Sequence, residues 1–265
     1  MNKQIPKMKN KSKQLAPALT RGLTVIEALS QDPYEMNMAE LSEVLDIPKA
    51  SLWRILTVLT EREYVILDKK RHTYRLGFKL MYMGSALLAG AHFKSQVRDY
   101  LKRLAQETGE TTELDVRVRD QLVVVDQVTG PNAVYLYSHT GSAIPYFHAT
   151  APGKVYLAHM ERSRMRSAMK RLGLPMLTAH TIQDIEQLEK EIEKIMIDGY
   201  AVDIEEMREG VGRVAAPVYD ESNKIKGCLA IVCPAFRLNE QNNKYEYGRS
   251  VKAIANELSK NFGGF

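Results

Sequence analysis

The sequence has little cysteine and no long apolar run. Its 265 residues include two cysteines, Cys228 and Cys233, which stand in one apolar stretch. Two such cysteines make neither a disulfide framework nor a zinc spacing, and they fit the reducing cytoplasm. No apolar stretch reaches the roughly 20 residues that a membrane helix needs, and no apolar segment follows the N-terminal lysines as in a secretory signal. We therefore expect a cytoplasmic protein with no membrane partner.

The last two thirds of the chain also lack a net charge. Residues 80–265 hold 23 basic and 23 acidic side chains, whereas residues 1–79 hold 14 basic and 9 acidic ones, so the whole excess of +5 lies in the first part. A locally basic module on a neutral remainder favours a polyanionic partner for that module. The alternative is a solubilising arm, because five lysines of the polar segment 1–16 account for the excess by themselves.

Two short helices joined by a tight corner are predicted between Met38 and Leu59. Apolar residues recur at helical spacing in both halves, and Pro48 suits the first turn of the second helix. With the apolar stripe facing inward, the second helix presents cations, hydroxyls and an indole, as a helix that enters the DNA major groove does. An ordinary helical hairpin is the alternative. The residues predicted to face DNA are Lys49, Ala50, Ser51, Trp53, Arg54 and Thr57.

A basic hairpin follows the helix pair. Two β-prone runs at 64–67 and 73–76 flank a polar turn that carries Lys69, Lys70 and Arg71. A helix at 18–30, the helix pair and this hairpin make, in that order, a winged helix-turn-helix whose wing tip touches phosphates or the minor groove. The mostly apolar segment 78–91 is predicted to be a helix that links two domains and packs on a partner chain or the second domain.

The remainder predicts a mixed α+β domain with a mostly antiparallel sheet. A helix at 97–107 precedes alternating strands, which are expected at 114–118, 122–128, 134–138, 144–147, 200–204, 213–219 and 225–233. Thr181 and Asp184 form a capping-box start for a long helix that ends at Gly199. Further helices are expected at 151–160, 162–171 and 239–260.

These segments resemble the IclR family of bacterial transcription regulators over nearly the whole chain from Leu19. The likeness rests on an ordered set of segments, and no single motif carries it. In the N-terminal part the matching segments are 20–27, 47–56 and 74–77, and in the C-terminal part they are 108–111, 148–154, 199–206 and 214–220. The resemblance implies a winged helix-turn-helix DNA reader, a linker helix and a GAF-like effector-binding domain, assembled as a homodimer or a dimer of dimers.

The resemblance also implies an effector pocket on one face of the C-terminal sheet. The positions that it assigns are Ala151, Gly153, Asp203, Val211, Arg213, Ala230 and Val232. The chain departs from relatives that bind small keto acids, because Pro152 has no N–H to donate and Ala230 and Val232 lack the hydroxyls found there. Arg213 replaces a smaller thiol side chain and is expected to hold a carboxylate in a bidentate pair. We therefore expect an organic, aromatic or sugar-derived acid as effector.

No set of residues predicts catalysis, a metal site or a cofactor. Gly153-Lys154 lacks the spacing of a phosphate-binding loop and indicates a tight helix start with a lysine at its edge. Glu205 and Glu206, as neighbours in a strand, are expected to face opposite ways and to be unable to act as a general acid–base pair. They are expected to be structural or to contact the ligand.

We interpret the chain as a sequence-specific transcriptional regulator, a repressor by expectation, that binds a pseudo-palindromic operator under the control of a small effector. The expected segments are a disordered basic tail at 1–16, a DNA-binding domain at 17–78, a linker helix at 79–95 and an effector domain at 96–265. The alternatives are a GAF-like binding module or enzyme without specific DNA binding, and a non-specific DNA binder.

Overall fold

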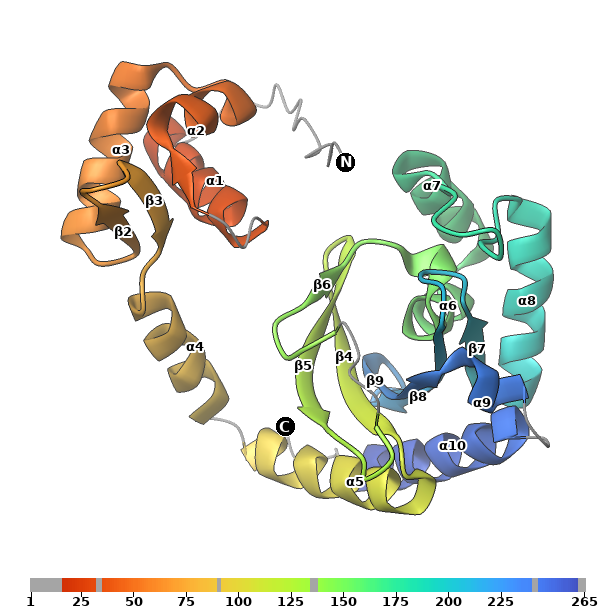
Figure 1. Ribbon diagram of the computed structural model, residues 1–265. Coiled ribbons are helices and arrows are strands. Elements are labelled where there is room, and N and C mark those ends of the chain that lie inside the picture. Colours follow the sequence, from red (N-terminus) through yellow and green to blue (C-terminus); the bar gives the residue numbers. More distant parts are fainter. Residues whose placement is uncertain (1–15, 32–34, 90–91, 134–137, 240–242, 262–265) are drawn as a thin grey trace. The chain divides into compact units, whose positions relative to one another are not determined.

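The computed structural model describes residues 16–31, 35–89, 92–133, 138–239 and 243–261 (Figure 1). The chain divides into two compact units, Met1–Ala91 and His92–Phe265. The predicted tail at 1–16 falls almost entirely outside the described residues, as does most of the strand expected at 134–138.

The N-terminal unit is a three-helix module with a small sheet. Its elements are α1 (Pro17–Gln31), β1 (Met36–Asn37), α2 (Met38–Leu45), α3 (Lys49–Glu61), β2 (Val65–Asp68), β3 (Thr73–Leu76) and α4 (Lys79–Ala89). The antiparallel sheet has the order β1-β3-β2, so β2 and β3 form the predicted hairpin while β1, which the sequence did not suggest, pairs with β3. Leu52 and Leu56 are fully buried, which confirms the apolar stripe of α3. In α2 Leu41 is fully buried, but Ala39 and Val44, also expected to face inward, are exposed.

The corner between α2 and α3 is fixed by local hydrogen bonds. Asn37 and Glu40 form a capping box at the start of α2. At the other end Asp46 adopts a left-handed conformation (φ 52°), and the backbone N–H of Ile47 donates to the carbonyl of Ser42. The Ser42 hydroxyl donates back to the Ile47 carbonyl at 2.7 Å. The angle at which α3 leaves α2 is therefore set within a few residues.

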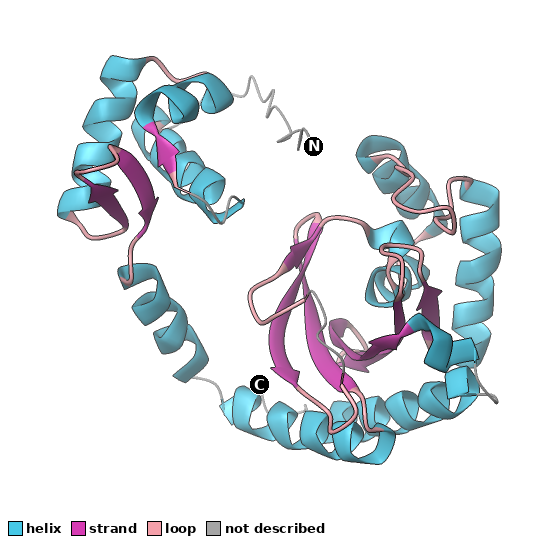
Figure 2. Ribbon diagram, viewed as in Figure 1, coloured by secondary structure: helices cyan, strands magenta, loops and turns pink. Residues whose placement is uncertain are grey.

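The C-terminal unit is built on one curled antiparallel sheet, as Figure 2 shows in magenta. Its six strands follow the order β6-β5-β4-β9-β8-β7. The strands are β4 (Thr111–Val118), β5 (Gln121–Val128), β6 (Ala143–Ile144), β7 (Ala201–Ile204), β8 (Val211–Tyr219) and β9 (Ile225–Pro234). The helices are α5 (His92–Thr108), η1 (Phe147–Ala149), α6 (Ala151–Ala158), α7 (Arg162–Leu172), α8 (Ile185–Asp198), α9 (Ala235–Asn239) and α10 (Asn243–Asn261).

The two faces of this sheet have separate cores. Alternate residues of β8 and β9, such as Val214 and Ile231, pack with α5 and α10 on the face that we call convex (Figure 1). Ala215, Ala230 and Cys228 lie on the opposite, concave face, where α6 covers them. Cys233 belongs to the convex core, so the two cysteines face opposite sides, as their odd spacing predicts.

Three local expectations are wrong. The strand expected at 144–147 is only Ala143–Ile144, because η1 begins at Phe147. The last helix is broken into α9 and α10. Asp184 alone caps α8 by accepting the N–H of Gln187, while the Thr181 hydroxyl donates to the carbonyl of Glu206 at 2.6 Å. Thr181 is thus part of a tertiary contact that sequence spacing does not reveal.

Candidate functional site

The outward face of α3 displays a cationic and aromatic surface. Lys49, Ala50, Trp53 and Arg54 are exposed, and Trp53 exposes 58% of its surface although it is the one tryptophan of the chain. This exposed indole is available for a contact outside the chain. The geometry agrees with the predicted DNA face, and the roles of the individual residues stay predictions.

The two hydroxyls predicted on this face already have partners. Arg21 of α1 donates to the Ser51 hydroxyl oxygen at 3.1 Å, and the Thr57 hydroxyl donates to the carbonyl of Trp53 at 2.9 Å. Sequence reasoning missed Arg21, which follows Thr20 in the first helix. Its guanidinium lies beside the start of α3 and adds a cation next to the predicted DNA face.

The wing tip holds three cations in the turn between β2 and β3. Lys69, Lys70 and Arg71 are exposed. The Asp68 carboxylate accepts the backbone N–H groups of Lys70 and Arg71 at 2.8 and 3.1 Å, and these bonds lower the pKa of Asp68. The backbone of the tip is thereby held. The Arg71 guanidinium lies 3.8 Å from the Glu35 carboxylate, and all three cationic side chains are exposed and can reach phosphates.

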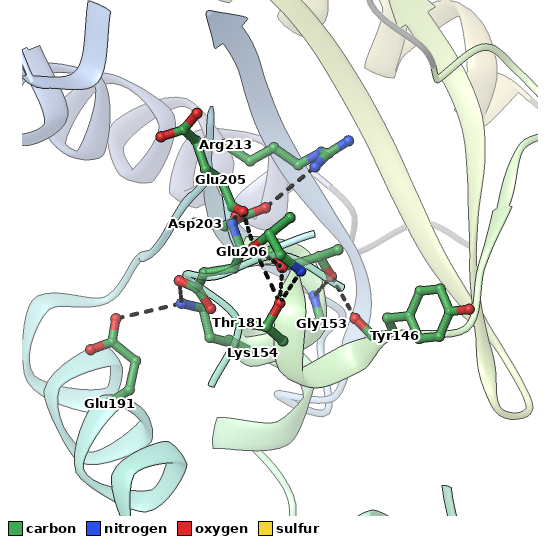
Figure 3. A network of polar contacts seen from close by, with 11 residues as sticks. Tyr146, Gly153, Lys154, Thr181, Glu191, Asp203, Glu205, Glu206 and Arg213 are labelled. Carbon is green, nitrogen blue, oxygen red and sulfur yellow. Dashed lines mark hydrogen bonds and ion pairs between the residues drawn. The ribbon is translucent and has the colours of Figure 1, made fainter. Parts of the chain in front are cut away.

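A buried ion pair marks the concave face of the C-terminal sheet. Asp203 of β7 and Arg213 of β8 are direct cross-strand partners, and Arg213 Nη1 lies 3.3 Å from Asp203 Oδ2. Asp203 is fully buried and Arg213 is 4% exposed. Figure 3 shows the Arg213 side chain extended across the sheet, away from the strand that carries it.

Two buried polar atoms on this face lack a hydrogen-bond partner among the described residues. They are Nε of Arg213 and Oδ2 of Asp115. Burial and the nearby charge of Glu113 raise the pKa of Asp115 well above its usual value, against the opposing influence of Arg213. Unsatisfied buried groups are costly in a native protein. The Arg213 N–H donor and the Asp115 carboxyl group, which lie on the same face, therefore indicate a binding place for a polar ligand.

Lys154 is the centre of a second buried group of charges, which we call the Lys154 cluster. Its ammonium is fully buried and lies 2.6 Å from the Glu206 carboxylate and 3.7 Å from that of Glu191 (Figure 3). The backbone N–H of Glu206 donates to Asp203 at 2.9 Å, which joins this cluster to the Asp203–Arg213 pair. A lysine with its charge buried is rare unless it is paired.

Backbone contacts hold the Lys154 cluster in place. The Thr178 and Thr181 hydroxyls each donate, at 2.6 Å, to the carbonyls of Glu205 and Glu206 respectively. A methyl group on Gly153 would lie 2.3 Å from the carbonyl oxygen of Phe147, so only glycine lets α6 begin so close to η1. This close approach sets where Lys154 enters the core.

We predict a pH-dependent stability from Glu206. Burial raises the pKa of Glu206 from 4.5 to about 7, although Lys154 opposes the rise. Between these values the native state binds more protons than the unfolded state, so stability falls as pH increases from about 5 to about 7, by at most about 1.4 kcal/mol per pH unit. Urea titrations across this range should show the fall, and Glu206→Gln should flatten it. An unchanged slope in that variant would contradict the assignment.

The structure brings most of the predicted effector residues to the concave face. Asp203 and Arg213 pair there, Ala230 and Val232 follow on β9, and Val211 lies half-buried at the start of β8. Ala151 and Gly153 lie in the first turn of α6, where sequence reasoning expects free loop amides. The Gly153 N–H already donates to the Thr150 hydroxyl at 3.2 Å, which argues against its use by a ligand.

Two further expectations are wrong in a way that changes the site. Lys154 is at the centre of a buried cluster, not at the edge of a helix. Glu205 and Glu206 lie beyond the end of β7, and Glu205 has a positive φ of 60°, so strand alternation does not apply to them. The burial of Lys154 has no local signal, because its carboxylate partners stand 37 and 52 residues further along the chain.

The described part of the chain holds no group of histidine, cysteine or acidic residues that could bind a metal ion. Within the same residues, no helix combines the length and the apolar character needed to cross a bilayer.

Comparisons with known proteins agree with this architecture. Residues 85–260 match the family model described as bacterial transcriptional regulator IclR C-terminal, and residues 18–68 match the IclR helix-turn-helix domain. The HTH-type transcriptional repressor AllR of Escherichia coli is 27% identical over 248 residues, which cover 94% of this chain and 91% of AllR.

Solved structures share the fold. An IclR transcriptional regulator from Alicyclobacillus acidocaldarius superposes with a TM-score of 0.83 at 25% identity, covering 94% of this chain and all of that one. An IclR homologue from Microbacterium hydrocarbonoxydans, solved in complex with 4-hydroxybenzoate, has a TM-score of 0.75 at 19% identity and covers 92% and 98% of the two chains. The first family match spans more than half of the 265 residues, so the protein belongs to the IclR family of transcriptional regulators, which regulate genes and are not enzymes.

Proposed function

We propose that this protein represses its target genes by binding a pseudo-palindromic operator and that a small organic acid controls this binding. The observation that carries the proposal is the exposed basic and aromatic face of α3 beside a cationic wing tip. In the proposed organisation residues 17–78 read DNA, residues 79–95 link and residues 96–265 bind the effector. Effector binding then shifts the DNA-reading domains by a coupling free energy of about 1–3 kcal/mol.

The first test is a gel-shift titration at near-physiological salt with DNA from upstream of the protein's own gene. Scrambled DNA serves as competitor, because basic surfaces bind any duplex through phosphates. A retarded band that survives the competitor supports sequence-specific binding. Equal competition by scrambled DNA identifies a non-specific binder, and no band with or without added acids favours the alternative of a GAF-like module without DNA binding.

Within the proposed interface we expect Arg54 to read a base. Replacing Arg54 with alanine should weaken specific binding by about 1–3 kcal/mol, roughly 5- to 150-fold, if its guanidinium contacts guanine. Arg164→Ala is a matched control, since that arginine is 84% exposed on the other unit. Footprint titrations on operator and scrambled DNA measure the change. An equal loss on both sequences would assign Arg54 to phosphate contact.

The proposed effector is an acid that also carries a hydroxyl group. Its carboxylate would pair with Arg213, whose Nε is buried with no hydrogen-bond partner among the residues described, and its hydroxyl would meet the buried Asp115. The alanines at 201, 215 and 230 form a row of small side chains across the concave face, next to the strand positions of Asp203 and Arg213. Thermal-shift screening of sugar acids and hydroxylated aromatic acids, followed by gel shifts, tests this class. Neutral polyols that bind as well as the acids would overturn it.

The proposed homodimer or dimer of dimers rests on an apolar surface at α4. Phe78, Met81, Tyr82 and Met83 expose between 47% and 73% of their surface. Large apolar side chains gathered on a short segment are typical of an interface, and a two-fold dimer would present two recognition helices to a palindrome. Sedimentation of Met81→Asp should show a smaller assembly than the parent protein. An unchanged assembly would exclude this surface.

A further inference from the structure

A groove lies at the open edge of the C-terminal sheet, separate from the proposed effector residues. It has a volume of about 210 Å³. One wall comes from α8, the floor from β7 and the other wall from the start of α10, with Glu206 at one end. The lining residues are Glu191, Lys194, Ile195, Asp198, Tyr200, Val202, Ile204, Glu206, Lys244 and Tyr245.

The floor offers an apolar surface and a free strand edge. Val202 and Ile204 point toward the convex side of β7 and line the groove. The Glu205 N–H donates to the carbonyl of Val211 on β8. Successive residues of a strand direct their N–H and C=O groups to opposite sides in the plane of the sheet. The N–H and C=O groups of Val202 and Ile204 therefore point away from β8, along an edge with which no described strand pairs. Such an edge can hydrogen-bond an extended amide or amino group.

One end of the groove has an excess of negative charge. Glu191 and Glu206 share the single ammonium of Lys154, and Glu206 Oε2 is buried with no hydrogen-bond partner in the part of the chain that the structure describes. Two carboxylates beside one cation leave an excess of negative charge, which favours a second cation at this end of the groove. In Figure 3 dashed lines join the Lys154 ammonium to both carboxylates.

The walls carry cations that could hold an anion. Neither Lys194 nor Lys244 forms an ion pair with a described residue, and the Lys244 ammonium lies 5.0 Å from the centre of the Tyr245 ring. The groove therefore combines an acidic end, an apolar floor and two free ammonium groups. Its volume of about 210 Å³ is below the roughly 300–1,000 Å³ of pockets for drug-sized ligands, so a ligand that it holds must be small.

We propose that this edge groove binds an α-amino acid with an apolar side chain. The ligand's ammonium would join Glu191 and Glu206, its carboxylate would face Lys194 and Lys244, and its side chain would cover Val202 and Ile204. The Glu206 N–H also bonds Asp203, so occupation of the groove reaches the Asp203–Arg213 pair through one hydrogen bond. The groove is thus a second input to the regulator, beside the proposed effector site.

Calorimetric titration of the full chain without DNA tests the proposal. The probes are leucine, isoleucine, valine and methionine, together with two analogues of leucine: 3-methylbutylamine, which lacks the carboxylate, and 4-methylpentanoate, which lacks the ammonium. We expect one or more amino acids to bind, the amine to bind more weakly and the acid not to bind. The proposal would be overturned if none of the four amino acids gave a binding signal at about 10 mM, or if 4-methylpentanoate bound as tightly as 3-methylbutylamine.

Charge-neutral variants locate the site. Glu191→Gln should weaken amino-acid binding at least about tenfold, and Lys194→Gln should weaken the amino acid but not the amine. Glu193→Gln, an exposed neighbour on α8 outside the groove, should change neither. Circular dichroism confirms that each variant is folded. Unchanged affinity in both Glu191→Gln and Lys194→Gln would place the ligand elsewhere. Because no DNA is present, a failed gel shift leaves this result untouched.

Discussion

The Lys154→Met substitution is expected to lower the free energy of unfolding by about 3–5 kcal/mol, because removing one partner of a buried ion pair leaves the other charge unpaired. Lys154 is fully buried, and its ammonium is the cation nearest to the Glu206 carboxylate. Methionine fills a similar volume, so the loss reports the charge and not a cavity. Urea denaturation followed by circular dichroism measures it.

A double variant separates the charge effect from packing. Adding Glu206→Gln to Lys154→Met removes the unpaired carboxylate, so the double variant should regain much of the lost stability. The single Lys154→Met protein should also become more stable as pH falls, since without the lysine the pKa of Glu206 rises further. A double variant as unstable as the sum of both single variants would show that the two side chains do not act as a pair.

The Arg213→Ala substitution is expected to have the second large effect. It should lower the free energy of unfolding by about 3 kcal/mol and abolish effector binding. The guanidinium pairs with Asp203, which is fully buried, and its charge also acts on Asp115. Without it Asp203 remains a buried carboxylate whose burial already raises its pKa, so protonation limits the cost. Denaturant titration at neutral pH measures the stability loss.

Two further variants separate the effect of Arg213 on effector affinity from its effect on stability. Asp203→Asn with Arg213→Ala should restore stability without restoring effector affinity. Arg213→Lys keeps the charge but not the two-pronged geometry, so it should bind a carboxylate effector more weakly than the parent while folding better than Arg213→Ala. Titration of the acid identified by screening provides the readout. Arg213→Ala protein that binds this acid as tightly as the parent would exclude Arg213 as its anchor.

Local regularity explains why much of the fold follows from the sequence. The apolar positions of α3 recur every three or four residues, which predicts a helix and its buried side. The central strands β8 and β9 are short, nearly continuous apolar runs, and both of their faces are buried. Leu52 and Leu56 turned inward as expected, and Cys228 and Cys233 faced opposite cores. Where the regularity stops, at η1 and between α9 and α10, the expected boundaries were wrong.

The candidate site is only partly visible in the sequence. Asp203 and Arg213 could be assigned to one face because a resemblance named their positions, and their pairing follows from the hairpin-like register of β7 and β8. Nothing in the segment around Lys154 marks it as buried, since it follows a glycine at a helix start, where lysines are usually exposed. The spacing of Thr181 and Asp184 before α8 likewise predicted a capping box, but the Thr181 hydroxyl bonds the Glu206 carbonyl and does not cap the helix.

The sequence by itself determined the type and order of the elements, the basic character of the first unit and the family, because periodicity, turns and ordered motifs are local properties. Only the tertiary structure decided which charges meet. The strand order β4-β9-β8-β7 brings Asp115 onto the same face as Arg213, and the start of α6 brings Lys154 between Glu191 and Glu206. These contacts join residues far apart in the chain, and their energies depend on burial, which no local pattern specifies.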